Sequence, residues 1–218
     1  MRFTPGFKLG LVLALALGAL AGCARTYYAT WEKLGKEKRD LLRSHISQAI
    51  GDQEEASEQF KDALERLKAL YGFEGGELEQ LYDGLKGDYE RSESKAADVR
   101  GRIERVEKTA HDLFAEWEKE LGEIQSSKLR SQSRARLAET RARFADMDAA
   151  MQRAAAAMQP VLAQLKDYVL FLKHNLNARA IGSLESEAGA IETDVNQLIA
   201  AMSESIRQAD AFIKELPD

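Results

Sequence analysis

A heptad repeat in the second half of the chain restricts the possible folds most strongly. Six apolar residues recur at every seventh position: Leu137, Phe144, Met151, Met158, Leu165 and Leu172. Four more follow three residues later, in the same register: Met147, Ala154, Val161 and Tyr168. Positions three, four and seven apart share one face of an α-helix, and this spacing is typical of a coiled-coil stripe. The repeat predicts one long helix that buries the stripe, and Pro160, outside it, should bend the helix without displacing an apolar residue.

Three other segments carry the same kind of stripe. Residues 30–70 contain apolar residues at steps of three and four, with Gln53 as the one polar member. Residues 77–125 and 179–216 repeat the pattern. The predicted helices are separated by residues that favour turns. These are three glycines within residues 72–76, the serines at 126, 127, 131 and 133, and the segment His174–Asn177.

These segments predict an all-α protein. No proline lies between Cys23 and Gln159, and Gly84 and Gly87 are expected to bend the second helix. Helices of roughly 35 to 50 residues are about 55 to 75 Å long, and short connections favour antiparallel neighbours. We therefore expect residues 31–216 to form one elongated antiparallel bundle of about four long coiled-coil-like helices. The alternative is a pair of helical hairpins that dimerise, which would make the protein a homo-oligomer.

The first 22 residues have the three parts of a secretory signal. Arg2 and Lys8 form a positively charged segment before an apolar run, Leu9–Leu20, which is too short for a bilayer core about 30 Å thick. Ala21–Cys23 resembles the bacterial lipobox, in which the cysteine sulfur receives a diacylglyceryl group and the chain is cut before that cysteine. We expect residues 1–22 to be a lipoprotein signal peptide and Cys23 to be the lipidation site. The alternative is an ordinary cleaved signal followed by an incidental cysteine.

Lipidation at Cys23 sets the expected location. Residues 23–30 would tether the bundle to the membrane, and Ala24 in place of aspartate favours the outer membrane in the proteins that share this motif. Cys23 is the only cysteine, so an acylated chain keeps no thiol for a disulfide, a metal or catalysis. Each buried CH₂ of an acyl chain contributes about 0.8 kcal/mol, so several chains anchor stably. We expect a lipid-anchored protein of the bacterial cell envelope that faces the periplasm.

Two stretches resemble a known family. The first comprises Thr26–Tyr28, Glu32–Lys36 and Lys38–Arg39, and the second is Phe171–Ala178. They look like the domain of unknown function 2959 family, which consists of uncharacterised helical bacterial lipoproteins. The resemblance covers nearly the whole chain after residue 22 and implies a helical, membrane-tethered protein. It carries no assigned activity, so it transfers no functional residue.

An antiparallel arrangement predicts which turns share an end of the bundle. If the first helix leaves the membrane, the glycine turn and the His174–Asn177 turn are both distal. They bring together aromatic, imidazole and amide side chains that a purely structural turn does not need: Tyr71, Phe73, His174, Asn175 and Asn177. We predict that this membrane-distal tip contacts a protein partner.

Basic residues gather at the opposite, membrane-proximal end. They include Lys33, Lys36, Arg39, Arg130 and Arg134. One interpretation is contact with phospholipid head groups or other anionic envelope polymers, worth up to about 1 kcal/mol per side chain. The favoured interpretation is pairing with glutamates of the second helix, worth about 0.2 to 1 kcal/mol per exposed pair: Glu116, Glu118, Glu120 and Glu123.

No catalytic motif is recognisable in the chain. His45, His111 and His174 lie on different segments without a glutamate three residues before them, so the paired Glu-x-x-His ligands of di-iron bundles are absent. There is no Gly-rich phosphate loop and no G-x-S-x-G motif, and a net charge of −5 argues against nucleic acid as a partner. We expect a non-enzyme without a cofactor or metal, acting as a scaffold or adaptor. The alternative is a helical-bundle module that binds a small ligand or metal in the periplasm.

Overall fold

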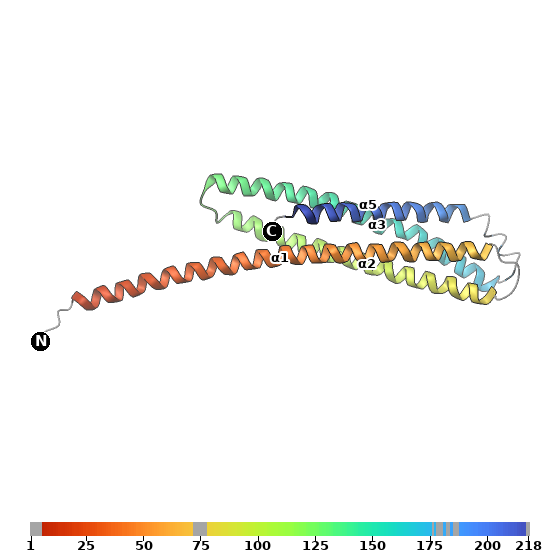
Figure 1. The fold of residues 1–218 in the computed structure, drawn as a ribbon, viewed down its shortest axis with the longest axis horizontal. Coiled ribbons are helices and arrows are strands. Elements are labelled where there is room, and N and C mark those ends of the chain that lie inside the picture. The colour runs from red at the N-terminus through yellow and green to blue at the C-terminus, as the bar shows by residue number, and fades with distance from the viewer. Residues whose placement is uncertain are drawn as a thin grey trace.

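A computed structural model describes the backbone of residues 6–71, 78–175, 177, 181, 184 and 188–216, and side chains from residue 38 onward. The helices of this part are α1 (Gly6–Tyr71), α2 (Leu78–Leu121), α3 (Ser127–His174) and α5 (Ala188–Glu215). Figure 1 shows them as an elongated bundle, from which the N-terminal half of α1 extends alone. The predicted all-α architecture is confirmed.

The four helices enclose one core. α1 contacts α2 and α5, and α3 contacts the same two helices. Neighbours run antiparallel: His45 on α1 meets Thr109 on α2 at 2.9 Å, whereas Gln59, further along α1, reaches back to Asp88. A single chain therefore supplies all four sides of this core.

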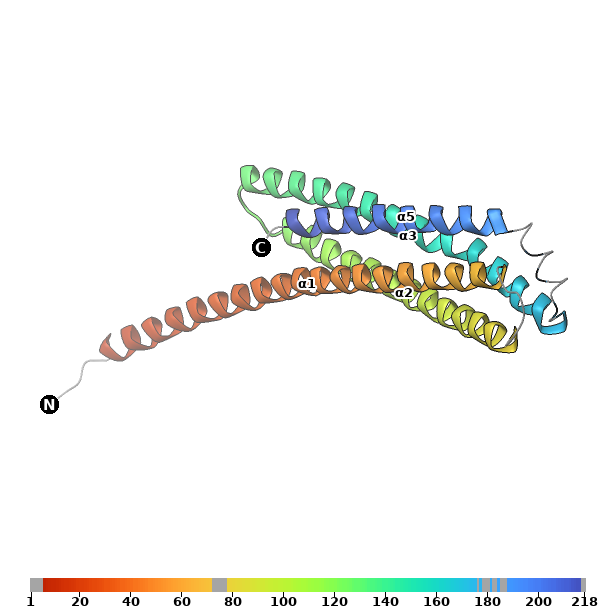
Figure 2. The same cartoon turned by 45° about the vertical axis from the view of Figure 1, so that its right-hand side comes forward.

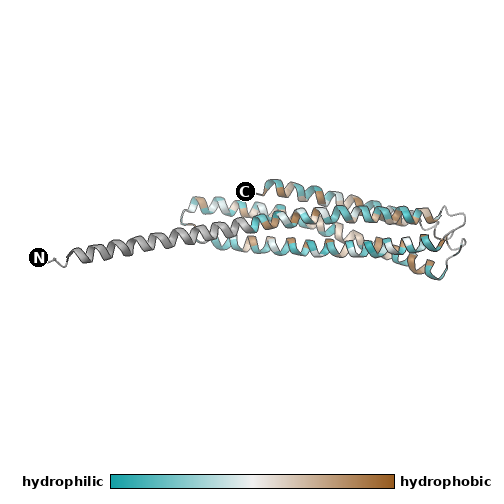
Figure 3. Ribbon diagram, turned by 60° about the horizontal axis from the view of Figure 1, so that its bottom comes forward, coloured by the Kyte–Doolittle hydropathy of each residue, from teal (hydrophilic) through white to brown (hydrophobic). Residues whose placement is uncertain are grey.

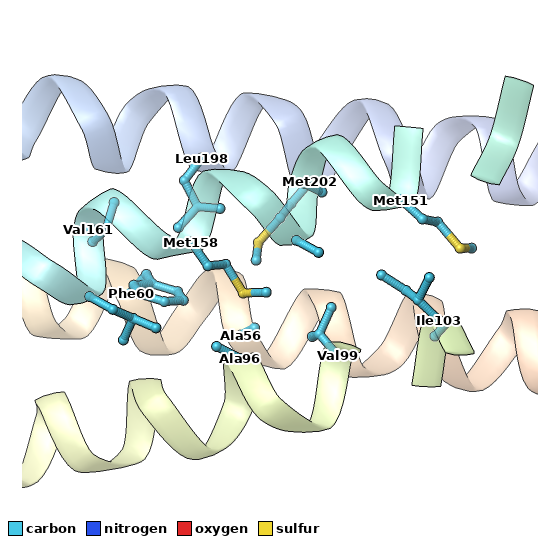
Figure 4. Close-up of a cluster of buried hydrophobic side chains, with 14 of the residues drawn as sticks. Ala56, Phe60, Ala96, Val99, Ile103, Met151, Met158, Val161, Leu198 and Met202 are labelled. Atoms are coloured by element: carbon cyan, nitrogen blue, oxygen red, sulfur yellow. The ribbon is translucent and has the colours of Figure 1, made fainter. Parts of the chain in front are cut away.

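The predicted apolar stripes form this core. In the heptad repeat of α3, Met151, Met158, Leu165 and Leu172 are buried almost completely. Figure 4 shows Met151 and Met158 among side chains of other helices, including Phe60 of α1. Apolar and polar residues alternate along each helix in Figure 3, as expected for helices that bury one face only. The stripe stays buried on both sides of Pro160, at Met158 and Val161, as predicted.

The turn between α2 and α3 is shorter than predicted. α2 ends at Leu121, and Ser126 caps α3, because its Oγ accepts a hydrogen bond from the Leu129 backbone at 3.4 Å. Serines 131 and 133, predicted to belong to this turn, lie inside α3, so that part of the prediction is wrong. Ser133 is used in packing instead, since its Oγ accepts a hydrogen bond from Trp117 Nε1 at 2.9 Å.

The other predicted turns fall partly outside the described residues. α1 ends at Tyr71, directly before the predicted glycine turn, whose residues 72–77 are among those not described. α3 ends at His174, as predicted. The predicted start of the last helix near residue 179 also lies outside the described residues. Residues 23–30, expected to form an extended tether, are helical within α1, which agrees with the absence of proline there.

Two ends of the bundle can now be distinguished. At the near end, from which α1 extends toward residue 6, lie the turn between α2 and α3 and the end of α5 (Figures 1 and 2). At the far end lie the C-terminal ends of α1 and α3 and the beginnings of α2 and α5. This arrangement matches the predicted grouping of the turns.

A buried carboxylate joins α1 to α2 toward the far end. The side chain of Asp88 is 2 % exposed and forms ion pairs with Arg66 of α1 and Arg91 of its own helix. Gln59 Nε2 donates to Asp88 Oδ1 at 3.3 Å. Both arginines remain in contact with solvent, so the two cations reach inward to a buried anion.

Gly84 and Gly87 make room for these arginines. A Cβ at Gly84 would lie 2.9 Å from Cδ and Nη1 of Arg66, and one at Gly87 would lie 3.1 Å from Nη1 of Arg91. Glycine is unfavourable inside a helix by about 1 kcal/mol relative to alanine. The close approach of the two arginines explains why this cost is tolerated in α2.

Alanine substitutions at two glycines of α2 should have different effects. Gly101→Ala is expected to raise the free energy of unfolding by about 0.5 to 1 kcal/mol, because alanine is the better helix former and nothing lies within 4 Å of the new Cβ. Gly84→Ala should bring no such gain, because it displaces Arg66. Urea denaturation followed by circular dichroism measures both, and equal stabilisation would contradict the proposed role of Gly84.

Candidate functional site

The candidate residues of the membrane-distal tip lie at the far end of the bundle. Tyr71, the last residue of α1, is half-buried, whereas His174, Asn175 and Asn177 are exposed. Phe73 lies outside the described residues. α3 therefore presents most of the candidate side chains that can be placed.

Asn175 has a structural role at this end. It caps α3: its backbone N–H donates to the carbonyls of Phe171 and Leu172, and its Nδ2 donates to the Phe171 carbonyl at 3.0 Å. These bonds satisfy carbonyls that the end of a helix otherwise leaves unpaired. Asn175 is thus less available to a partner than its neighbour His174.

Two exposed apolar residues at the far end were missed by the sequence analysis. Leu170 and Phe171, in the last turns of α3, are 49 % and 37 % exposed. They lie beside the buried stripe residue Leu172 but point away from the core. Their signal in the sequence was two large apolar residues outside the heptad positions. Neighbouring apolar residues left exposed are a feature of contact surfaces.

Several basic residues at the near end have partners within the bundle. Lys38 Nζ lies 3.3 Å from Glu116 Oε2, and Arg141 Nη2 lies 2.7 Å from Glu118 Oε2, in line with the favoured interpretation. Arg130 stabilises the turn between α2 and α3 by donating through Nε to the Ile124 carbonyl at 2.9 Å.

The other basic residues predicted at the near end differ in their exposure to solvent. Arg134 is exposed, and Arg39 is half-buried. The side chains of Lys33 and Lys36 are among those not described.

The glutamates near Lys38 crowd one another. Burial, together with the charges of Glu116 and Glu123, raises the pKa of Glu120, while Lys38 and Arg39 act in the opposite direction. Basic side chains of α1 and α3 pair with two members of this acidic cluster: Lys38 with Glu116, and Arg141 with Glu118.

Two neighbouring carboxylates, Glu107 of α2 and Asp148 of α3, lie between these helices. Asp148 is half-buried beside Glu107, whose Oε1 accepts a hydrogen bond from Gln152 Nε2 at 2.5 Å. Burial and the nearby Glu107 charge raise the pKa of Asp148 to about 6. A raised pKa of this kind marks a functional residue only when a cleft or substrate site accompanies it, and here it sits in a helix interface.

This pair predicts a pH dependence of stability. Asp148 binds its proton more tightly in the folded state, with a pKa of about 6, than in the unfolded chain, where the value is near 3.8. The wild type should therefore lose stability as the pH rises from about 4 to about 6, and Asp148→Asn should remove this loss. We expect the variant to be more stable by about 1 to 2 kcal/mol at pH 7.5, after allowance for solvent screening, and equal to wild type near pH 4.

Urea denaturation at several pH values measures this effect. Asp146→Asn is the matched control, because Asp146 is exposed on the same helix. An equal gain from both variants at pH 7.5 would mean that the Glu107 interaction is not responsible.

A groove of about 780 Å³ runs between the C-terminal third of α1 and the middle of α5. Its lining includes Met202 and Ile206 of α5 and a row of acidic residues of α1. Glu58 pairs with Lys61 at 2.6 Å, and Glu55 pairs with Lys95 of α2. The groove is of the size of a small-ligand site, but acidic residues in its wall already have cationic partners.

The comparison with protein families identifies the chain. A family model described as "Protein of unknown function (DUF2959)" matches residues 27–216. The chain belongs to the DUF2959 family. A comparison with curated proteins found no match. The match begins within the part of α1 that extends from the bundle and continues to the end of α5, so it includes all four described helices of the bundle.

The DUF2959 assignment carries no residue roles, so chemistry must be judged from the side chains. In the part of the chain that the structure describes, no three His, Cys, Asp or Glu side chains are grouped to hold a metal ion. His45 contacts Thr109, while His111 is exposed beside Asp112. Among the described helices of this DUF2959 protein, none is long and apolar enough to cross a membrane.

Proposed function

We propose that this DUF2959 protein is a non-catalytic scaffold or adaptor of the bacterial cell envelope. It is acylated at Cys23 after removal of residues 1–22, is held in the outer membrane and faces the periplasm. Its bundle presents the far end to a protein partner. The partner contact is centred on Leu170, Phe171 and His174.

The observation that supports this proposal is the continuity of α1. One helix runs from Gly6 to Tyr71, so the residue proposed as the anchor and the far end of the bundle belong to the same element. From Cys23 to Tyr71 the helix advances about 70 Å at 1.5 Å per residue. A continuous helix transmits orientation as well as distance, which a flexible tether of the same length does not.

The chemistry of the far end favours a protein as the partner. Leu170 and Phe171 are exposed, and the exposed side chains of Lys173 and His174 follow directly. An apolar centre with a polar surround is the usual composition of a protein contact surface. The same end also contains Lys68 and Glu192, which pair at 2.6 Å across α1 and α5 and hold these helices together.

Photocrosslinking in cells tests the proposal. A photoreactive residue at Phe171 of the full chain is expected to capture one discrete envelope protein. The same residue at Arg153, exposed in the middle of α3, should capture none. The adduct from position 171 should fall several-fold when Leu170 and His174 are both replaced by serine.

Two results would count against this function. One is capture of the same proteins from positions 153 and 171, and the other is an adduct that Leu170→Ser and His174→Ser leave unchanged. Either would mean that the far end does not select a partner.

A further inference from the structure

We infer that the first turns of α3 form a second membrane contact, on the head groups of anionic phospholipids. The contact consists of the exposed side chains of Lys128, Leu129 and Arg136, called here the basic face. The inference rests on the proposed anchoring at Cys23, and adds to it a contact that sets how the bundle sits on the bilayer.

The charge of this segment is opposite to that of the whole protein. From Ile124 to Ala138 there are four basic residues and no acidic one, in a chain of net charge −5. In the described part of the chain, Lys128, Arg134 and Arg136 form no ion pair, unlike Lys38, Arg141 and Arg143 nearby. The basic face therefore retains its charge for an external partner.

The tertiary structure leaves this face uncovered. Arg143 pairs with Glu215, the last residue of α5, so the part of α3 that precedes Arg143 extends beyond α5 (Figure 1). Leu129 is 57 % exposed, the largest value among the exposed large apolar residues of the described chain. Leu129 and Arg136 are seven residues apart and so share one side of α3. An apolar side chain beside cations is the pattern of a helix that lies at a membrane interface.

The register of α1 and α2 shows how close this face lies to Cys23. Lys38 and Glu116 pair and so lie at the same level. From that level, Gly122 lies about 9 Å and Cys23 about 22 Å toward the N-terminal end of α1, at 1.5 Å per residue. The turn that begins α3 is thus about 14 Å from the level of the proposed anchor. This gap is close to the combined thickness of a head-group layer and a Debye length of about 8 to 10 Å.

A tilt of the bundle closes the remaining gap. Within the basic face, Lys128 lies nearest the start of α3 and reaches the surface first, followed by Leu129 and Arg136 on the same side of the helix. Each basic side chain near an anionic surface favours the bound orientation by about fivefold. Lys128 and Arg136 together therefore favour the tilted orientation by about 25-fold on an anionic bilayer.

A fluorescent probe at position 129 tests the contact. Full-length protein is purified from bacterial membranes and reconstituted into vesicles of phosphatidylethanolamine and phosphatidylglycerol, or of phosphatidylcholine alone. Cys23 is the only native cysteine and is blocked when acylated, so Leu129→Cys accepts a single environment-sensitive label. Leu170→Cys is the matched control, because Leu170 has similar exposure on the same helix but lies at the far end.

The expected result is a blue-shifted emission at position 129 in the anionic vesicles only. Head-group-labelled lipid should quench this probe at least fivefold more strongly than the probe at position 170, and high salt should abolish the difference. The double variant Lys128→Gln and Arg136→Gln should also abolish it. The double variant Arg153→Gln and Lys166→Gln changes the net charge equally along α3 and should have no effect.

The outcomes separate this inference from the proposed anchoring. Protein that floats with the vesicles while the probe at position 129 stays in water overturns the basic face alone. Protein that takes two labels and does not float overturns the anchor at Cys23, and the basic face with it. An emission shift that occurs only with a soluble anionic polymer overturns the assignment to lipid.

Discussion

Replacing Arg66 and Arg91 together by methionine is expected to lower the free energy of unfolding by about 3 to 5 kcal/mol. The reason is the carboxylate of Asp88, which is buried between α1 and α2 and forms ion pairs with both arginines. Without them, Asp88 keeps only the amide of Gln59 as a cross-helix partner. An ion buried without a counter-charge costs several kcal/mol, because it loses its hydration without compensation.

A third substitution separates the cost of the buried charge from lost packing. Adding Asp88→Leu to the double variant should recover most of the stability, because it removes the isolated anion and fills its place with apolar volume. Arg207→Met is the matched control for loss of an exposed pair: its partner Glu204 lies 2.6 Å away on the surface of α5, and the cost should stay below about 1 kcal/mol.

Urea denaturation followed by circular dichroism measures all these variants. A double variant that loses no more stability than Arg207→Met would show that Asp88 is not effectively buried. A triple variant that stays as unstable as the double variant would attribute the loss to the packing of the arginine side chains.

Replacing Cys23 by serine is expected to abolish acylation of the chain. Serine lacks the sulfur to which acyl chains are attached in the lipobox proteins, so the variant should carry no acyl mass and should retain residues 1–22. The effect should be large, because each buried CH₂ of an acyl chain contributes about 0.8 kcal/mol and an anchor contains several chains.

Intact mass spectrometry and detergent phase partitioning measure this change. Wild type should begin at residue 23 with added acyl mass and enter the detergent phase. Ala24→Ser is the control, since it alters the neighbouring residue and leaves the sulfur in place. An unmodified thiol at Cys23 in wild-type protein from bacterial membranes would contradict both this prediction and the proposed location.

Much of the bundle was predictable because helical periodicity is a local property. The stripes that begin with Leu42 and with Leu137 are buried where predicted, and Gln53 is buried at its predicted place within a stripe. Asp88 and Ser92, also buried, were not predicted. They occupy a gap in the apolar pattern of α2, and a polar residue in such a gap is usually exposed.

The candidate contact surfaces were less predictable. Asn175 was selected from its place in a turn, but its hydrogen bonds to α3 give it a capping role. Leu170 and Phe171 were overlooked because a helix that packs on several neighbours can bury apolar residues outside its main stripe. Their exposure depends on where α3 passes the ends of the other helices, which periodicity does not show.

The amino-acid sequence by itself determined the helices, their apolar faces and the candidate lipidation residue, because each depends on neighbours a few positions away. The assembled bundle alone showed that Arg66 meets Asp88, that Lys38 meets Glu116 and that Leu129 has no cover. The physical reason is register. Shifting one helix by a turn along its neighbour preserves every apolar stripe, but it changes the ion pairs between helices and the length of each exposed helix end. Only packing in three dimensions selects among these arrangements.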